Sequence, residues 1–386
     1  MTERPVLPGT PAQRLYHGKP IEPYRLGVIV DLPEHPGLSD AFPDMVQFAL
    51  DEAHARGVVE RPVELVVREV FGQPWTSSHS LRRVYGELVE HDVLGVIGPF
   101  TTDNSLAVLD LTEAHRLPTM SICGSLHWRG PYAFVIPNGG LADEPYVMTS
   151  WLAAQGHRRV GVLRERTQIG EEYAEHFRRA VQLSGLTVVA EPPVYPSMHV
   201  DELVRALEEC RSAGPDALVY LGLGGINQTV RPALEKLGWD PPRIQTTAYV
   251  SAGYSEERAR RIEGWVGVDQ YHEGNDAYAA VLDRFAQRYG YRPANSGGSC
   301  GYDIGHAFAH GLGRMRHASP WGLRDALETV RRLPACTGGP GTTITFGPQD
   351  HRGLKGPDFL VLRRSVDGRS VLEGTAAISG WTQPTG

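Results

Sequence analysis

A regular alternation of short apolar runs with amphipathic segments constrains the fold of this chain more than any other feature. The first apolar run, residues 25–32, has no polar alternation, which is typical of a strand buried on both faces. The segment that follows, up to Arg56, carries an apolar stripe at helical spacing between Ser39, a candidate N-cap, and Gly57. Because such units repeat, we expect an α/β fold with doubly wound parallel sheets covered by helices on both faces.

The alternation occurs in two blocks. In the first block we expect strands at 25–32, 63–70, 93–97 and 118–122. In the second block we expect strands at 159–164, 187–190, 217–221, 244–249 and 265–271. Three helices should follow at 276–289, 301–315 and 321–332, and the runs 342–346 and 359–363 should pair with each other as terminal strands. Two blocks of about 120 residues in a chain of 386 predict two similar α/β lobes.

Composition and charge exclude several classes of protein. Hydrophobic residues make up 41% of the chain, enough for two cores, and the net charge of −7 comes with no basic stripe for nucleic acid. No apolar run approaches the length of a membrane helix. The cysteines at 123, 210, 300 and 336 form no CxxC pair, although their pairing stays open. We therefore predict no nucleic-acid partner, no membrane insertion, no metal and no cofactor.

Residues 1–23 contain several prolines and glycines and no apolar core segment. We expect an extended N-terminal arm there rather than a secretory leader. As the sequence stands, this predicts a cytoplasmic protein. If the native start is truncated, the prediction changes to a periplasmic or other extracytoplasmic protein.

Four local phrases, together with the order of the elements, carry a resemblance to a known family. The phrases are Val93-Leu-Gly-Val-Ile-Gly-Pro-Phe100, Leu117-Pro-Thr-Met-Ser121, Gly301-Tyr-Asp-Ile-Gly-His306 and Ile344-Thr-Phe-Gly-Pro-Gln-Asp350. Over about 24–372 the chain resembles the type I periplasmic-binding-protein superfamily, close to its branched-chain amino-acid and amide-binding branch. The resemblance implies two lobes that are joined by a three-segment hinge and close on a small molecule. Lobe 1 would comprise 24–138 plus 276–345, and lobe 2 would comprise 139–275 plus 346–386.

Two loops of lobe 1 are candidate ligand contacts, because ligands of open α/β sheets lie beyond the carboxyl ends of the strands. A helix N-terminus there suits a carboxylate or amide oxygen. In the loop after the third strand, our candidates are Phe100, Thr101 and Thr102. Plain N-capping by Thr102 or Asp103 is the alternative, and Asp103 would repel an anion.

The loop after the fourth strand matches the family pattern of small residues followed by Ser or Thr. Its candidate residues are Cys123, Gly124 and Ser125. We expect Cys123 to be a small apolar wall rather than a nucleophile, because free cysteines are usually buried.

In lobe 2 the sequence departs from the amino-acid binders that it resembles. Ile169 occupies the position of a tyrosine in those proteins, and Gly224 or Gly225 occupies the position of a second aromatic residue. The acidic residue that pairs the ligand's ammonium is replaced by Tyr249. A buried ammonium without a carboxylate is costly, so we expect an amide, or an aromatic or other carboxylate, rather than a plain branched-chain amino acid. Tyr249 and Tyr271 would stack on it, with hinge packing as the alternative for Tyr271.

The resemblance implies non-catalytic binding of a small organic ligand, with an ABC permease or a cytoplasmic regulatory protein as partner. The protein would be a substrate-binding protein or a cytoplasmic amide sensor. One alternative is a twin-lobed enzyme such as a nucleotide-sugar transferase, but we find no phosphate-cradling loop or acid–base pair. A transcription regulator would need an N-terminal helix-turn-helix. The GxSxG match at 297–301 lacks a preceding strand, so we predict no catalytic residue.

Overall fold

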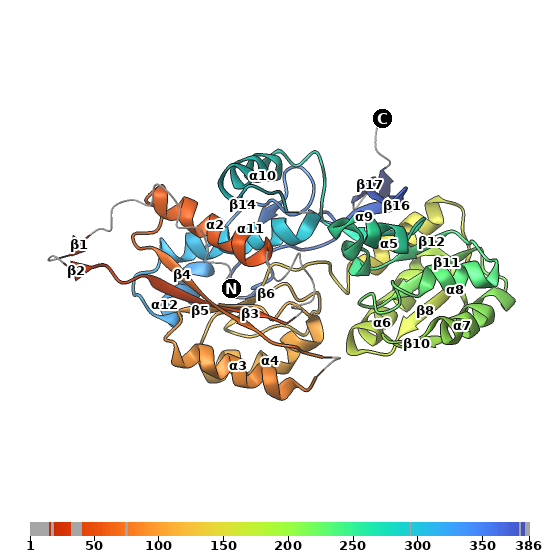
Figure 1. Ribbon diagram of the computed structural model, residues 1–386, viewed down its shortest axis with the longest axis horizontal. Coiled ribbons are helices and arrows are strands. Elements are labelled where there is room, and N and C mark those ends of the chain that lie inside the picture. The colour runs from red at the N-terminus through yellow and green to blue at the C-terminus, as the bar shows by residue number, and fades with distance from the viewer. Residues whose placement is uncertain are drawn as a thin grey trace.

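Two separate β-sheets organise the chain into two α/β lobes, which lie side by side (Figure 1). The structure is a computed structural model that describes residues 15–16, 19–31, 41–73, 76–293, 295–377 and 380–382. Most of the expected N-terminal arm therefore lies outside the described residues. Only a short antiparallel pair, β1 (Leu15–Tyr16) and β2 (Lys19–Pro20), is described before residue 21.

Lobe 1 contains a five-stranded, all-parallel sheet in the order β4-β3-β5-β6-β7. Its strands are β3 (Tyr24–Val30), β4 (Val63–Glu69), β5 (Gly95–Ile97), β6 (Thr119–Ser121) and β7 (Ala133–Val135). Side chains alternate between two cores: Val28 and Val30 face α2 (Ala41–Ala55) and α11 (Asn295–Leu312), whereas Ile29 faces α3 (Ser78–Glu90) and α4 (Thr102–Ala114). The helices α10 (Asp276–Tyr289) and α12 (Pro320–Leu327) complete this lobe.

Lobe 2 contains a nine-stranded sheet in the order β10-β8-β11-β12-β13-β16-β17-β18, with β9 also paired to β8. Its strands are β8 (Arg159–Glu165), β9 (Thr187–Ala190), β10 (Pro193–Val194), β11 (Ala217–Leu221), β12 (Arg243–Gln245), β13 (Val266–Asp269), β16 (Val361–Val366), β17 (Arg369–Ala377) and β18 (Gly380–Thr382). The strands up to β13 are parallel and the last three are antiparallel.

The helices of lobe 2 cover both faces of this sheet. One face carries α5 (Glu144–Ala154) and α6 (Gln168–Ser184), and the other carries α7 (Val200–Ser212) and α8 (Val230–Leu237). The 3-10 helix η1 (Thr247–Tyr254) and α9 (Glu256–Arg261) follow β12. The α/β class and the parallel, doubly wound sheets predicted from the sequence are therefore confirmed.

Several expectations about individual elements were wrong: the expected helix 321–332 ends at Leu327 as α12, and three further differences follow. The runs at 342–346 and 359–363 do not pair with each other: β15 (Thr343–Ile344) pairs with β14 (Leu333–Pro334), and β16 lies between β13 and β17. The expected strand 244–249 ends at Gln245, because the Thr246 side chain accepts a hydrogen bond from the backbone N–H of Ala248 and starts η1.

The third difference is that α11 begins at Asn295 rather than Gly301, so the GxSxG match lies inside a helix. Glycines let this helix pack closely on α2. A Cβ atom at Gly301 would lie 2.8 Å from the carbonyl oxygen of Phe42, and one at Gly305 would lie 2.6 Å from that of Val46.

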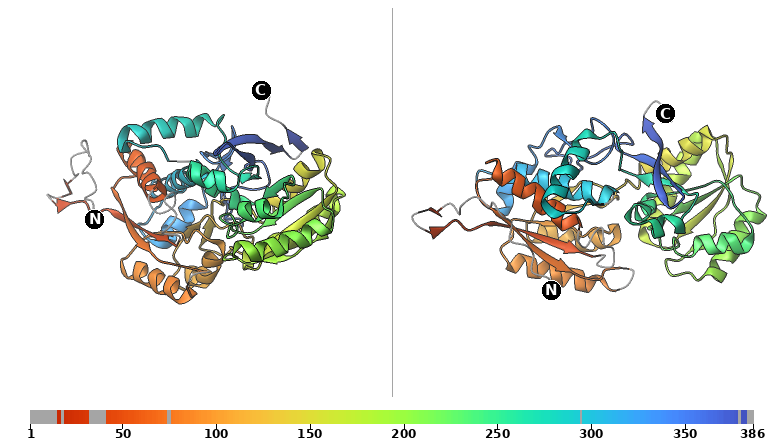
Figure 2. Two further views of the ribbon diagram at one scale, coloured as in Figure 1. Left: turned by 45° about the vertical axis from the view of Figure 1, so that its right-hand side comes forward. Right: turned by 45° about the horizontal axis from the view of Figure 1, so that its top comes forward.

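The chain passes between the lobes three times, after β7, after β13 and after β15, which forms the three-segment hinge (Figure 2). The residue boundaries of the lobes given above stay a prediction. Among the described residues, no helix combines the length and the apolar character that crossing a membrane requires.

Candidate ligand-binding cleft

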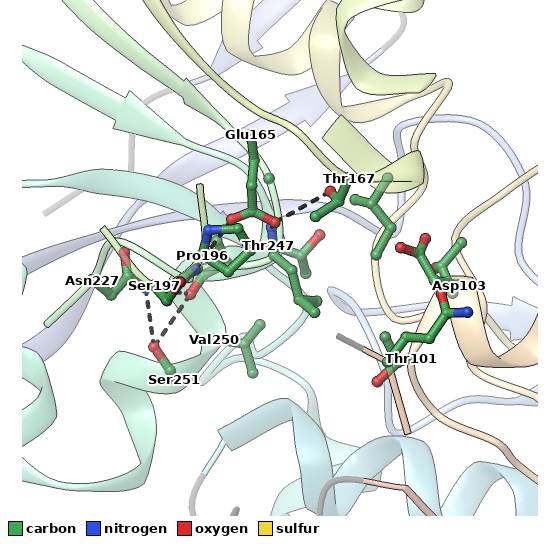
Figure 3. A pocket seen from close by; sticks show the side chains of 18 of the residues that line it. Thr101, Asp103, Glu165, Thr167, Pro196, Ser197, Asn227, Thr247, Val250 and Ser251 are labelled. Carbon is green, nitrogen blue, oxygen red and sulfur yellow. Dashed lines mark hydrogen bonds between the residues drawn. The ribbon is translucent and has the colours of Figure 1, made fainter. Parts of the chain in front are cut away.

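A cavity of about 930 Å³ lies between the two lobes and is lined by residues from both (Figure 3). Its walls are the segments that follow the carboxyl ends of parallel strands, as expected for an open α/β sheet. Lobe 1 contributes 100–103, Ile122 and Asn138; lobe 2 contributes 165–169, 222–225 and Thr247 among others. The volume falls within the range of small-molecule sites.

Asp31, the residue after β3, holds the first turn of α4 in place from behind. Its buried carboxylate accepts hydrogen bonds from the backbone N–H of Phe100 (2.6 Å), the backbone N–H of Thr101 (3.1 Å) and Nδ2 of Asn104 (2.7 Å). Burial raises the pKa of Asp31, and these donors partly counteract that effect. The carboxylate thus orders the loop just before α4, which begins at Thr102 after the N-cap Thr101.

Three polar atoms on lobe 1 are buried and have no hydrogen-bond partner among the described residues. They are Oγ1 of Thr101, Oδ1 of Asp103 and Oδ1 of Asn138, and all three residues line the cleft. Thr101 is only 3% exposed. Burial, and then the charge of Glu165, raise the pKa of Asp103 to about 6, while the N–H groups of Ile169 and Gln168 act in the opposite direction.

Glu165, the last residue of β8, faces Asp103 from lobe 2 (Figure 3). Its side chain is buried, and its carboxylate accepts hydrogen bonds from the hydroxyl of Tyr220, the backbone N–H groups of Leu223 and Gly225, and Oγ1 of Thr167. These four donors make Glu165 the centre of the glycine-rich turn 222–225.

This turn requires glycine for steric reasons. A Cβ atom at Gly225 would lie 2.3 Å from Cα of Pro196, and Gly224 has a φ of 103°. Lobe 2 therefore brings backbone, not an aromatic ring, to this wall of the cleft.

Glu144, in the first turn of α5, connects the hinge to the cleft floor. It accepts hydrogen bonds from the backbone N–H of Gly140 (2.9 Å), the hydroxyl of Tyr173 (2.7 Å), and both the backbone N–H (2.8 Å) and the hydroxyl of Thr247. Tyr173 and Thr247 line the cleft. Burial raises the pKa of Glu144 to about 7.

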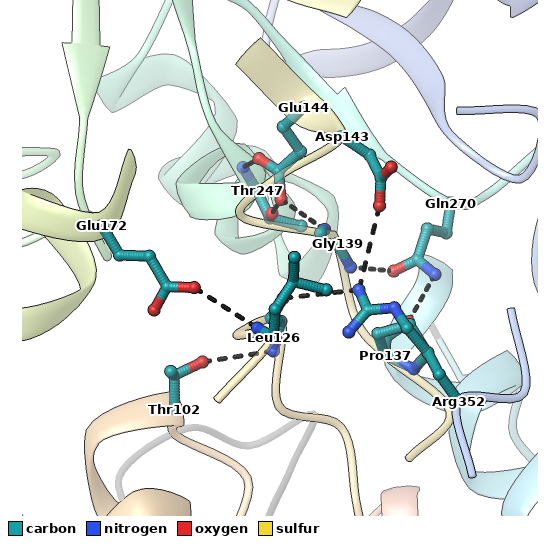
Figure 4. A network of polar contacts seen from close by, with 12 residues as sticks. Thr102, Leu126, Pro137, Gly139, Asp143, Glu144, Glu172, Thr247, Gln270 and Arg352 are labelled. Carbon is teal, nitrogen blue, oxygen red and sulfur yellow. Dashed lines mark hydrogen bonds and ion pairs between the residues drawn. The ribbon is translucent and has the colours of Figure 1, made fainter. Parts of the chain in front are cut away.

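Polar contacts hold both the hinge and one edge of the lobe interface (Figure 4). Gln270 accepts from the N–H of Gly139 (2.7 Å) and donates to the carbonyl oxygen of Pro137 (2.8 Å). At the edge, Glu172 of α6 accepts hydrogen bonds from Oγ of Ser125 (2.7 Å) and the N–H of Leu126 (3.3 Å). Helix α6 of lobe 2 is thereby joined directly to a loop of lobe 1.

The structure places half of the predicted contact residues at the cleft. Those that line it are Phe100, Thr101, Thr102, Ile169 and Gly224. Those that do not are Cys123, Gly124, Ser125, Tyr249 and Tyr271. Whether any of the ten touches a ligand stays a prediction.

The five residues outside the cleft have partners within the protein. Burial raises the pKa of Cys123 to about 12, and the N–H of Gly124 donates to Oγ1 of Thr102 (3.3 Å). Tyr249 is fully buried and its hydroxyl donates to Oγ of Ser370 (3.0 Å). Tyr271 lies under the guanidinium of Arg363, 4.9 Å from the ring centroid.

Sequence reasoning missed Glu165, Asn138 and Thr247. Each ends or follows a strand of a parallel sheet, the same signal that identified Thr101 and Thr102. Thr247 was missed because it was expected inside the strand 244–249, whereas it is the first residue of η1.

A cavity between two α/β lobes on a three-segment hinge is the architecture of a ligand-binding protein that encloses its solute. The profile of a family described as periplasmic binding protein matches residues 23–361. The chain therefore belongs to the periplasmic binding protein family, as the resemblance predicted. No curated protein sequence matches the chain.

Solved structures from several bacteria share this fold. A periplasmic binding protein type 1 from Bordetella pertussis Tohama I has a TM-score of 0.76 at 18% identity, covering 94% of this chain and 100% of that chain. An ABC transporter substrate-binding protein from Desulfitobacterium hafniense in complex with Leu has a TM-score of 0.75 at 18% identity, covering 91% and 100%. A branched-chain amino acid transporter substrate binding protein from Streptococcus pneumoniae in complex with isoleucine has a TM-score of 0.74 at 17% identity, covering 94% and 100%.

Proposed function

We propose that this protein binds a small organic solute in the cleft without changing it chemically, and that the hinge closes over the solute for delivery to an ABC permease. One observation carries the proposal: three buried polar atoms on Thr101, Asp103 and Asn138 face one cavity without partners among the described residues. A buried polar group without a hydrogen bond costs about 1–3 kcal/mol. A bound solute that completes these bonds recovers that free energy.

The polarity of the walls narrows the ligand classes. Asp103 and Glu165 put two carboxyl groups on opposite walls, and the unpartnered oxygens of Asp103 and Asn138 are acceptors. A solute that donates N–H bonds, such as an amide, fits these acceptors. Two of the similar structures contain leucine or isoleucine; for this cleft, the unpartnered acceptors of Asp103 and Asn138 lead us to propose an amide-like solute.

The glycine-rich turn argues against the enzyme alternative. In a phosphate-cradling loop the backbone N–H groups point at the phosphate. Here the N–H groups of Leu223 and Gly225 donate to Glu165 at 3.3 and 3.2 Å. The described residues also offer no feature that favours a sensor role over transport.

Thermal unfolding of the purified protein with a solute panel tests this function. The panel holds branched-chain and aromatic amino acids, short amides, ureas, amines, aromatic acids and nucleotides. A solute at 100 times its Kd should add about 2.7 kcal/mol to the stability. Stabilisation by small organic solutes supports the function, stabilisation only by nucleotides supports the enzyme alternative, and no stabilisation contradicts the proposal.

The variant Thr101→Val tests whether the unpartnered Thr101 hydroxyl binds the solute. Removal of an unpartnered buried hydroxyl should leave the free energy of unfolding unchanged or slightly higher, while solute binding weakens roughly fivefold. The control is Thr112→Val on the same helix, whose hydroxyl donates to the carbonyl oxygen of Leu109 (2.8 Å); it should lose stability and keep affinity. Unchanged affinity in Thr101→Val would remove Thr101 from the site.

A further inference from the structure

We propose that the outer edge of β4 in lobe 1 pairs with the same edge of a second copy of this chain, so that two five-stranded sheets join into one continuous sheet. The interface lies outside the cleft: within the described part of the chain, no residue of β4 lines the cavity. The dimer is therefore separate from the proposed solute binding, and its formation does not require the solute.

The backbone of β4 leaves one edge of the lobe 1 sheet open. Among the described residues, β4 pairs only with β3, which makes it the outermost strand of the sheet. The N–H of Val70, directly after β4, donates to the carbonyl oxygen of Val30 (2.9 Å). Because the residues of a strand alternate in direction, the even-numbered residues of β4 bond to β3. Leu65 and Val67 therefore direct their N–H and C=O groups away from the sheet.

The outward groups of this edge are only partly covered within the chain. The carbonyl oxygen of Val63 accepts a hydrogen bond from Nε2 of Gln47 (3.0 Å), and that of Val67 accepts one from Nη1 of Arg68 (3.0 Å). No other strand of the described residues pairs with the N–H groups of Leu65 and Val67. Such an edge is a template for another strand, which would replace the Arg68 contact with a backbone hydrogen bond.

An antiparallel register centred on Val66 brings the outward groups of two copies into phase. Leu65 then lies opposite Val67 of the second copy, and the two residues exchange both of their N–H···O=C bonds. The two-fold axis repeats this pair on its other side. The two copies of Val66 meet on the axis as a pair without hydrogen bonds, in agreement with an N–H that faces β3. A two-fold interface of this kind is closed after two copies.

The same register makes β4 complementary to itself in charge, which identifies a second copy as the occupant. Glu64 lies opposite Arg68 of the second copy, and no like charges face each other. Opposite charges directly across an antiparallel pair stabilise the pair. Within one copy, Glu64 contacts Arg25 at 3.5 Å, and Arg68 contacts Glu87 at 3.7 Å and His91 at 2.7 Å. Exposed contacts of this kind contribute little, so their exchange costs little.

Apolar side chains along β4 gain burial in the dimer. Leu65 and Val67 are partly buried against the lobe 1 core that includes α2 and α11, and Val66 is partly buried against the core beneath α3. These three side chains lie on both faces of the sheet, and each keeps some exposed surface. A second β4 beside them covers part of that surface, so burial adds to the stability that the backbone and the charges provide.

Sedimentation velocity of the unsubstituted protein over a wide range of concentrations should show a reversible monomer–dimer equilibrium. Val67→Pro should make the protein monomeric, because it removes an outward N–H and no bond to β3. Glu64→Arg should weaken the dimer about tenfold or more, and the double variant Glu64→Arg/Arg68→Glu should restore it, because opposite charges face each other again. The matched control is Glu208→Arg in lobe 2, an exposed partner of Arg211, which should leave the dimer unchanged.

Thermal unfolding of each variant checks that it is folded, and the charge-swap series decides the outcome if Val67→Pro folds poorly. A protein that stays monomeric at every concentration overturns the inference. A dimer that keeps its affinity in Glu64→Arg overturns it as well, because the contact then lies on another face. Neither result bears on solute binding, so failure of this interface and failure of the proposed function are distinguishable.

Discussion

At the residue scale, the carboxylates around the cleft differ in how completely their oxygens are hydrogen-bonded. Asp31 accepts from three donors, whereas Glu165 and Glu144 each accept from four. Oδ1 of Asp103 has no partner among the described residues. The first three therefore serve the protein's own architecture, and Asp103 is the one with a free acceptor directed at the cleft.

Glu144 gives a prediction about pH. Its pKa is about 7 in the folded protein and lies near 4.5 in an unfolded chain, because burial disfavours the charged form. The folded state therefore holds a proton that the unfolded chain releases. The stability from this group is fully present below about pH 4.5 and is lost as the pH rises through about 7.

Urea unfolding between pH 5 and pH 8 should therefore show a fall in the free energy of unfolding of on the order of 2 kcal/mol from this group. Glu144→Gln should remove that part of the slope, since glutamine does not titrate. Equal slopes in the two proteins would show that Glu144 is already ionised at pH 5.

The residues explain how far sequence could identify the site. Thr101, Thr102 and Ile169 were predictable, because the carboxyl end of a buried strand can be read locally. The position of Tyr249 was not predictable from the sequence. The strand ends early because Thr246 caps η1, and within η1 the Tyr249 ring is buried in the lobe 2 core. Asp31 has its carboxylate hydrogen-bonded and Asp103 has one oxygen without a partner among the described residues. This difference depends on contacts between residues far apart in the sequence, which a local sequence pattern does not contain.

At the element scale, helices and buried strands with strong periodicity were predicted well. Helix α10 and strand β11 have the expected bounds, Asp276–Tyr289 and Ala217–Leu221. The partner of β16 was not predictable, because an apolar run shows that a strand is buried but does not show which strand it pairs with.

Helix α6 is the element that links the lobes, and its contact with the 125–126 loop gives a second prediction. Glu172→Ala removes the acceptor of the Ser125 hydroxyl and the Leu126 N–H, so the closed arrangement loses two hydrogen bonds. We expect solute binding to weaken roughly three- to tenfold, mainly through faster dissociation. Stopped-flow release of the tightest-binding panel solute measures it.

The control for this variant is Glu175→Ala on the same helix, where the carboxylate pairs with Arg179 on an exposed surface. It should bind the solute like the unsubstituted protein, because surface ion pairs contribute little. If the two variants release the solute at the same rate, the Glu172 contact does not contribute to closure.

At the scale of the whole molecule, the account depends on two lobes that move relative to each other about the hinge. The resemblance predicted this architecture, and the family match over 23–361 confirms the family. The solute class is the part that the fold cannot supply, because fold alone does not fix function. It depends on the side chains that line the cleft.

Closure is tested most directly by pulsed electron–electron double resonance, which measures the distance between one spin label on each lobe. Labels at Glu113→Cys on α4 and Leu183→Cys on α6 would be exposed and selective, because the native cysteines at 123, 210, 300 and 336 are all buried. The account predicts that the tightest-binding panel solute shortens and narrows the distance distribution between the labels. A distribution that stays unchanged while the solute is bound would contradict closure of the lobes over a ligand.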